Sequence, residues 1–175
     1  SMIPADQLEV VLNKVVELAA EQGVTGISNG LPNEQVIPDD PDLVIADQAL
    51  EDGDFQSAIT AFEKVLARKP GDPEATQGLA NAKLLLRTSL ADANAAQAAV
   101  LTNPEDAKAQ ALAADFEIMS GQAEAALERL IKFIATNSGT QRDIARTHLL
   151  ELFQNFAPTE PILIAARSAL SKALF

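Results

Sequence analysis

A period of 34 residues constrains the fold of this chain more than any other feature of its sequence. Pro70 and Pro104 are 34 residues apart, and Gly53 and Gly121 are separated by twice that distance. The repeating unit contains two segments with apolar residues at helical spacing, joined by a short turn. A repeat of two short helices cannot bury its apolar faces alone and stacks on its neighbours. The period therefore predicts an all-α solenoid.

The residues at fixed positions of this period resemble those of the tetratricopeptide repeat. That pattern has an alanine, a phenylalanine four positions later, and a proline after the second helix, and Ala58, Phe62 and Pro70 match it. The first helix of each unit also has a small residue where neighbouring helices are expected to cross, namely Ala46, Ala80 and Ala114. We therefore expect a right-handed TPR-like helical solenoid of three repeats plus C-terminal capping helices.

The repeats occupy the larger, C-terminal part of the chain. In residues 1–22, a segment with a wide apolar face begins at Pro4 and ends before Gly23, which predicts one helix. Residues 23–41 are rich in proline and glycine and predict a linker. Residues 42–175 form the predicted repeat domain.

We expect the second repeat to be irregular. Arg87 stands where the first repeat has its turn glycine, and Asp92 and Ala96 replace the signature alanine and phenylalanine of the second helix. A shorter or shifted helix is therefore expected within residues 90–103, because little apolar area is left to bury. The remaining helices are expected at residues 42–52 and 55–69 in the first repeat, within 107–140 in the third, and at 140–156 and 160–174 as caps.

The composition argues against several classes of function. A net charge of −12 disfavours nucleic acids and anionic membranes as partners. Without cysteine the chain has no disulfide and no thiolate zinc site. No apolar run approaches the roughly 18 residues of a membrane span. We therefore expect a cytoplasmic protein that binds neither nucleic acid nor membrane.

No group of residues suggests catalysis. His148 is the only histidine, and no residue at a suitable spacing offers it a metal or acid–base role. We expect an ordinary helix residue, with Glu151 three positions later as its neighbour on the same face. The sequence also lacks a glycine-rich phosphate loop in a strand–loop–helix unit. We therefore expect no enzyme activity, no cofactor and no metal site.

The candidate binding surface is the concave groove of the solenoid, which the first helix of each repeat is expected to line. The predicted groove residues are Leu43, Asp47, Leu50, Gln77, Asn81, Leu84, Lys108, Asp115 and Ile118. Their mixture of apolar and acidic side chains suits unfolded or extended polypeptides with hydrophobic and basic segments, although a plain solvated face is the alternative. Repeats that clamp acidic chaperone tails carry Lys and Asn where Leu43 and Asp47 stand, so we do not expect such a clamp.

Several segments together resemble a more specific family. The linker ends in Ile-Pro-Asp-Asp-Pro at residues 37–41, and residues 119–130 read Met-Ser-Gly-Gln-Ala-Glu-Ala-Ala-Leu-Glu-Arg-Leu. In residues 149–175, Leu-Leu-Glu-Leu-Phe precedes a proline-marked turn and an arginine-containing helix that ends in Leu-Phe. Residues 3–175 in this way resemble the C-terminal half of the bacterial thioredoxin–tetratricopeptide co-chaperones, the chaperedoxins. By this resemblance, residues 1–22 would be the remnant last helix of a thioredoxin-like domain.

The resemblance implies a protein that holds unfolded clients and hands them to the chaperonin through its last helix. The implied chaperonin-docking residues are Arg167, Leu170, Leu174 and Phe175. Two alternatives remain: a generic TPR scaffold for protein–protein interaction, and the substrate-binding part of a thioredoxin-type redox protein. The helix of residues 1–22 could also pair between chains and form a homodimer.

Overall fold

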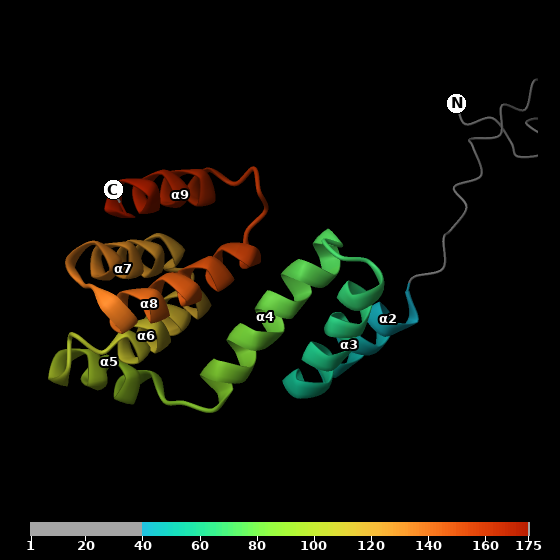
Figure 1. Cartoon of the computed structure of the whole chain (residues 1–175). Coiled ribbons are helices and arrows are strands. Elements are labelled where there is room, and N and C mark those ends of the chain that lie inside the picture. Colours follow the sequence, from blue (N-terminus) through green and yellow to red (C-terminus); the bar gives the residue numbers. More distant parts are fainter. Residues whose placement is uncertain (1–39, 175) are drawn as a thin grey trace, which may run out of the picture. The chain divides into compact units, whose positions relative to one another are not determined.

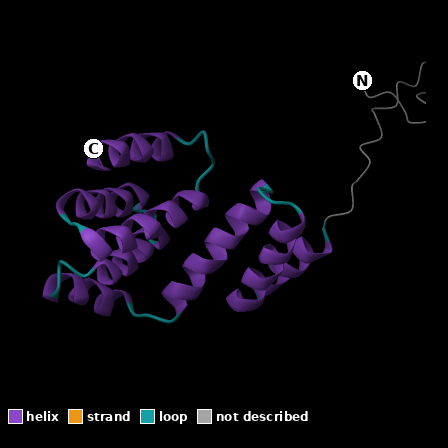
Figure 2. Ribbon diagram, in the orientation of Figure 1, coloured by secondary structure: helices purple, strands orange, loops and turns teal. Residues whose placement is uncertain are grey.

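The computed structural model describes residues 40–174, which belong to one compact unit that begins at Asp39 (Figure 1). This described part contains helices and no strand (Figure 2), so the predicted all-α solenoid is confirmed. The elements are α2 (Pro41–Glu51), α3 (Phe55–Arg68), α4 (Pro73–Ser89), α5 (Ala93–Thr102), α6 (Ala107–Met119), α7 (Ala123–Thr136), α8 (Gly139–Leu152), the 3-10 turn η1 (Phe153–Asn155) and α9 (Pro161–Leu174). The helix predicted in residues 1–22, the homodimer built on it and most of the predicted linker lie outside the described residues.

Aspartates begin five of these helices. Each accepts a hydrogen bond from a backbone N–H of the first turn, which satisfies one of the donors that a helix start leaves free; they are Asp40, Asp54, Asp72, Asp92 and Asp106. The turns between α2 and α3 and between α6 and α7 use Gly53 and Gly121, whose φ angles of 74° and 76° are in the left-handed region. The aspartate caps and the turn glycines therefore explain where these helices begin and end, although only Asp72 and Asp106 among the caps are 34 residues apart.

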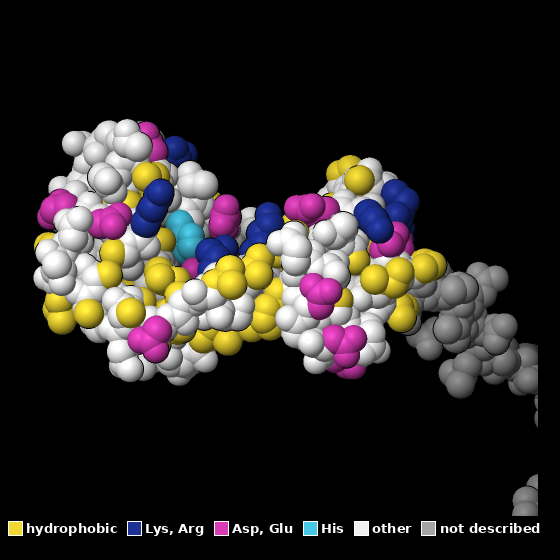
Figure 3. Space-filling model, turned by 90° about the horizontal axis from the view of Figure 1, so that it is seen from below, with side chains coloured by type: hydrophobic (Ala, Val, Ile, Leu, Met, Phe, Trp, Pro, Cys, Tyr) yellow, Lys and Arg dark blue, Asp and Glu magenta, His cyan; other side chains and the backbone are white. Residues whose placement is uncertain are grey.

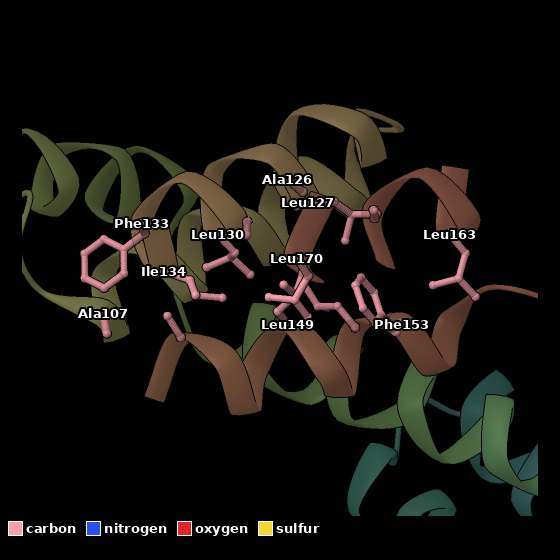
Figure 4. Packing of buried hydrophobic residues seen from close by; sticks show 14 of the residues in the cluster. Ala107, Ala126, Leu127, Leu130, Phe133, Ile134, Leu149, Phe153, Leu163 and Leu170 are labelled. Carbon is pink, nitrogen blue, oxygen red and sulfur yellow. The ribbon is translucent and has the colours of Figure 1, made fainter. Parts of the chain in front are cut away.

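The buried residues form two main cores that share α4. The first core consists of α2, α3 and α4 and contains Phe62 and Val65. The second consists of α6 to α9 and contains Leu130 and Leu149 (Figure 4). Leu84 of α4 packs into this second core. Helix α4 is therefore the element through which the two cores are connected.

The second repeat departs from the regular pattern, as expected. Helix α4 continues through Arg87 and ends only at Ser89, because no glycine is present to turn the chain. Helix α5 is 10 residues long and packs against α6, with no comparable contact to α4. Ala80 is half-buried and lines a small pocket with Arg87 and Glu151. Ala46 and Ala114 are fully buried.

The elements after α7 pack on the third repeat and also on α4. Helix α8 packs on α6 and α7, and η1 folds back onto α4. Helix α9 packs along α7. The predicted capping role of the last two helices is consistent with these contacts, and the return of η1 to α4 is a feature that the period does not contain.

We predict that Gly78→Ala destabilises the protein. An alanine normally stabilises a helix interior relative to glycine by about 1 kcal/mol. A Cβ at Gly78, however, would clash with the buried Phe62 ring. Overpacking of this kind costs about 1–3 kcal/mol, so the free energy of unfolding in urea should fall. Asn81→Ala, on an exposed position of the same helix, is the control and should not destabilise; an equal gain in stability for both variants would contradict the prediction.

Candidate protein-binding groove

A groove of about 550 Å³ lies between α2, α4, the end of α6 and η1. The structure brings six of the nine predicted groove residues together around it, namely Asp47, Leu50, Gln77, Asn81, Leu84 and Ile118. They come from the first helices of three successive repeats, which is the arrangement that the 34-residue period implies. The groove is therefore built largely from the elements expected for it.

Other lining residues were not found from the sequence. Phe62 of α3 reaches the floor of the groove beside Gly78, where the missing side chain leaves space for its ring. Met119, the last residue of α6, is 47% exposed, and Phe156 follows η1 on another wall. The return of η1 to α4 brings Phe156 here, and no local sequence pattern signals this contact. These three residues make the floor of the groove more apolar than the predicted residues alone would make it.

The rim of the groove is polar and partly acidic. Asp47 and Glu74 are exposed carboxylates on α2 and α4. The side-chain amide of Gln77 donates a hydrogen bond to the carbonyl oxygen of Asn155, at 3.1 Å, and so holds η1 against α4. The Asn81 side chain is exposed on the same helix. An apolar floor with acidic and amide groups above it can accept a polypeptide that carries both apolar and basic side chains.

Exposed apolar residues also lie outside this groove. Leu90, after α4, and Leu101, near the end of α5, are 79% and 77% exposed. Figure 3 shows hydrophobic side chains gathered along the middle of one face of the described part. Exposure of apolar side chains alone therefore does not define the binding site, and the concave shape at α2, α4 and α6 is the more specific feature.

Three predicted groove residues lie elsewhere. Leu43 is buried in the first core, and Lys108 is exposed in the first turn of α6. Asp115 is fully buried, so its predicted place on an open groove is wrong. It is buried because α4 and α8 both pack against α6 at this point and supply the partners of its carboxylate.

A network of charged side chains surrounds Asp115. Arg87 of α4 donates two hydrogen bonds, from Nε to Oδ2 at 2.7 Å and from Nη2 to Oδ1 at 3.0 Å. His148 Nε2 of α8 lies 2.8 Å from Oδ1. Glu151 is 3.6 Å from Nη1 of Arg87. His148 therefore pairs with Asp115 across helices, and the neighbour relation expected between His148 and Glu151 on one helix face is not its main contact.

Two effects act on the pKa of Asp115. Burial raises it, because the charged form loses its hydration. The hydrogen bonds from His148 and Arg87 lower it, together with the positive charges they bring. The net pKa lies below the ordinary value for an aspartate, so the carboxylate is ionised at neutral pH and accepts hydrogen bonds from α4 and α8. The Asp115 side chain therefore joins α4, α6 and α8 through its hydrogen bonds.

The three described residues among those implied for chaperonin docking differ in their exposure. Arg167 is exposed on α9. Leu170 is 7% exposed and belongs to the second core, and Leu174 packs partly buried against the same core. The buried Leu170 is therefore not available to a docking partner, because its side chain seats α9, whereas the partly buried Leu174 keeps some exposed surface. Phe175 lies outside the described residues.

Within residues 40–174, no helix is long and apolar enough to cross a membrane. In the same part of the chain, His, Asp and Glu side chains form no cluster of three or more that could hold a metal ion.

The fold and the groove define a helical-repeat protein of the kind that binds other proteins. Two family models, both described as tetratricopeptide repeat, match residues 49–93 and 86–175. The second match covers half of the chain, and the chain therefore belongs to the tetratricopeptide repeat family. No solved structure matches the chain.

Relatives in two mycobacteria extend over nearly the whole chain. Uncharacterized proteins of Mycobacterium tuberculosis and Mycobacterium bovis are 32% identical to it over 172 residues, which is 98% of this chain and 55% of each relative. The chain thus spans about half the length of the curated relatives it matches. The family rests on the two repeat models, and the resemblance to the chaperedoxins stays a prediction.

We predict that Asp115 makes stability depend on pH in the acid range. Its pKa in the folded protein lies below the value of about 3.9 for an unfolded chain. The stabilisation is therefore present above that value and is lost as the pH falls through the folded-state pKa. The free energy of unfolding in urea should fall as the pH drops below about 4, and less steeply in Asp115→Asn. Asp47→Asn, which alters an exposed carboxylate on α2, should keep the wild-type slope; equal slopes in wild type and Asp115→Asn would contradict the prediction.

Proposed function

We propose that this chain is a non-enzymatic scaffold that binds an extended segment of another protein in the groove between α2, α4 and α6. The observation that carries the proposal is the apolar floor bordered by exposed carboxylates. Leu50 and Met119 would contact apolar side chains of the partner, and Asp47 and Glu74 would contact its lysines or arginines. Tetratricopeptide repeats are protein-binding modules, and the apolar floor and acidic rim of this groove support that role for it.

The shape of the groove favours an extended partner. Its walls come from helices of three repeats and from the turn after α8, so a bound chain would pass several elements in succession. The amide of Asn81 lies on the rim, where it can hydrogen-bond to the backbone of a polypeptide without regular structure. Contacts to the backbone together with a few apolar anchors give affinity with modest sequence specificity. Such a site suits unfolded or extended polypeptides.

We predict that Met119→Lys weakens binding of a fluorescein-labelled peptide of Pro-Leu-Lys repeats, which proline keeps extended. The new charge lies in the groove and repels the lysines of the peptide, and we expect a loss of at least about tenfold in affinity by fluorescence anisotropy. The matched control is Leu101→Lys, which places the same charge at an exposed leucine on α5. The control should change affinity by less than about twofold.

A second peptide tests the sign of the charge. A labelled peptide that ends in Glu-Glu-Val-Asp should not bind, because Asp47 and Glu74 repel carboxylates. Equal losses in Met119→Lys and Leu101→Lys, or micromolar binding of the acidic peptide, would contradict the proposed groove.

A second candidate function is docking of α9 to a chaperonin, with the chain as a cytoplasmic co-chaperone that holds unfolded clients. The sequence resemblance implies it, and one structural observation favours it. Ile164 is 56% exposed, and Arg167 is exposed three positions later on the same helix. These two side chains would form the docking surface in place of Leu170, which seats the helix.

We predict that Ile164→Asp abolishes binding of the protein to a purified bacterial chaperonin in biolayer interferometry, because it places a charge in an apolar contact. Ile45→Asp on α2 is the matched control, since Ile45 is 53% exposed and far along the sequence from α9. The control should bind as the wild type does and should still suppress aggregation of a heat-denatured client. If the wild-type protein does not bind the chaperonin, the docking function is excluded, whereas the proposed scaffold function is unaffected.

A further inference from the structure

A second groove, which the proposed function does not use, lies between α7 and α9. Its volume is about 420 Å³. On α7 it is lined by Leu127 and Ile131, and on α9 by Ile162, Ala165 and Ala169. The two alanines are exposed and small, Ile131 is half-buried, and Leu127 is buried below them. We call this surface the α7/α9 groove.

Two carboxylates border the α7/α9 groove. Glu124 and Glu128 lie one helical turn apart on α7, and both are exposed. Within residues 40–174, neither forms a salt bridge. By contrast, Glu117 on the adjacent helix α6 is paired with Arg129. An apolar trough with two uncompensated negative charges along one wall is complementary to a surface that is apolar and basic.

We propose that the α7/α9 groove binds an amphipathic helix of a partner protein. Leucine-type side chains of this helix would fill the trough, and lysines or arginines four residues apart would meet Glu124 and Glu128. The spacing supports a helical partner, because residues four apart on both helices are separated by about 6 Å along their axes. Two helices side by side also form the kind of groove into which a third helix docks.

A second copy of this chain fits the α7/α9 groove less well. The chain carries a net charge of −12, so two copies repel each other, and the acidic wall of the groove adds to the repulsion. A partner helix with a basic face is attracted by the same charge. Charge complementarity therefore selects a basic helix over a homodimer.

The test uses a labelled helical peptide of about 18 residues with leucines on one face and lysines on the other. Binding to the full chain is measured by fluorescence anisotropy. The double variant Glu124→Lys with Glu128→Lys should weaken binding at least about tenfold. The control pair, Glu63→Lys with Glu105→Lys, makes the same change in net charge at exposed positions away from the groove and should weaken binding less than about threefold.

A third variant tests the shape of the groove without changing its charge. Ala165→Phe fills the trough from an exposed position of α9 and should also weaken binding at least about tenfold while circular dichroism stays unchanged. The same peptide with glutamates in place of lysines should not bind. Equal losses in the two charge-reversal pairs, or full binding by Ala165→Phe, would overturn the proposal.

The other binding modes give distinct results. A concentration-dependent dimer in light scattering that Ala165→Phe removes would identify a second copy as the occupant and overturn the proposal. Met119→Lys, in the groove of the proposed function, should leave binding of the helical peptide intact. Loss of that binding in Met119→Lys would show that the helix enters the first groove and would also overturn the proposal. Failure of the extended peptide to bind would affect only the proposed function.

Discussion

The buried carboxylate of Asp115 fixes how the helices on the concave side are arranged. Removing a carboxylate from water costs several kcal/mol, and this cost is offset only where hydrogen-bonding partners satisfy its oxygens in good geometry. Arg87 and His148 do so from α4 and α8, with three contacts of 2.7 to 3.0 Å. A shift of any of these helices would leave a buried charge incompletely paired. Because α4 belongs to both cores, the network also limits how the first core sits on the second, and so sets the width of the binding groove between α2, α4 and α6.

This arrangement of α4, α6 and α8 around Asp115 depends on the irregular second repeat, which supplies Arg87. A glycine in place of Arg87 would favour the end of the helix at the usual turn, and it would remove the guanidinium that satisfies Asp115. With Arg87, α4 is 17 residues long and reaches the second core through Leu84. Helix α5 then packs mainly on α6, since it has few large apolar residues to hold it on α4. The second repeat, which looks degenerate in the sequence, therefore differs in structure from the other repeats. Its first helix, α4, connects the two cores, and its second helix, α5, packs against the third repeat.

The sequence predicts local structure well and long-range contacts poorly. The helix boundaries follow from aspartate caps, turn glycines and apolar spacing, all of which act within a few residues. The partners of Asp115 lie 28 and 33 positions away, and the contact of Gln77 with Asn155 spans 78 positions. These separations depend on how far the solenoid curves, which the 34-residue period does not specify. One residue does indicate the contact in advance. Arg87 stands where the repeat pattern has glycine, and an arginine at such a position predicts an acidic partner in the next repeat.

The two proposed binding grooves are alike in charge but differ in shape. Each places carboxylates beside an apolar surface, so both would attract basic partners, and this attraction would weaken as salt screens it. Charge alone therefore cannot decide which partner enters which groove. Shape can: the first groove is bordered by parts of four elements and suits an extended chain, whereas the α7/α9 groove is bordered by two helices and suits a third. A partner that contains both an extended basic segment and a basic amphipathic helix could occupy both grooves at once. Its affinity would then depend on the length of the segment joining the two parts, because that length sets the effective concentration of the second part once the first is bound.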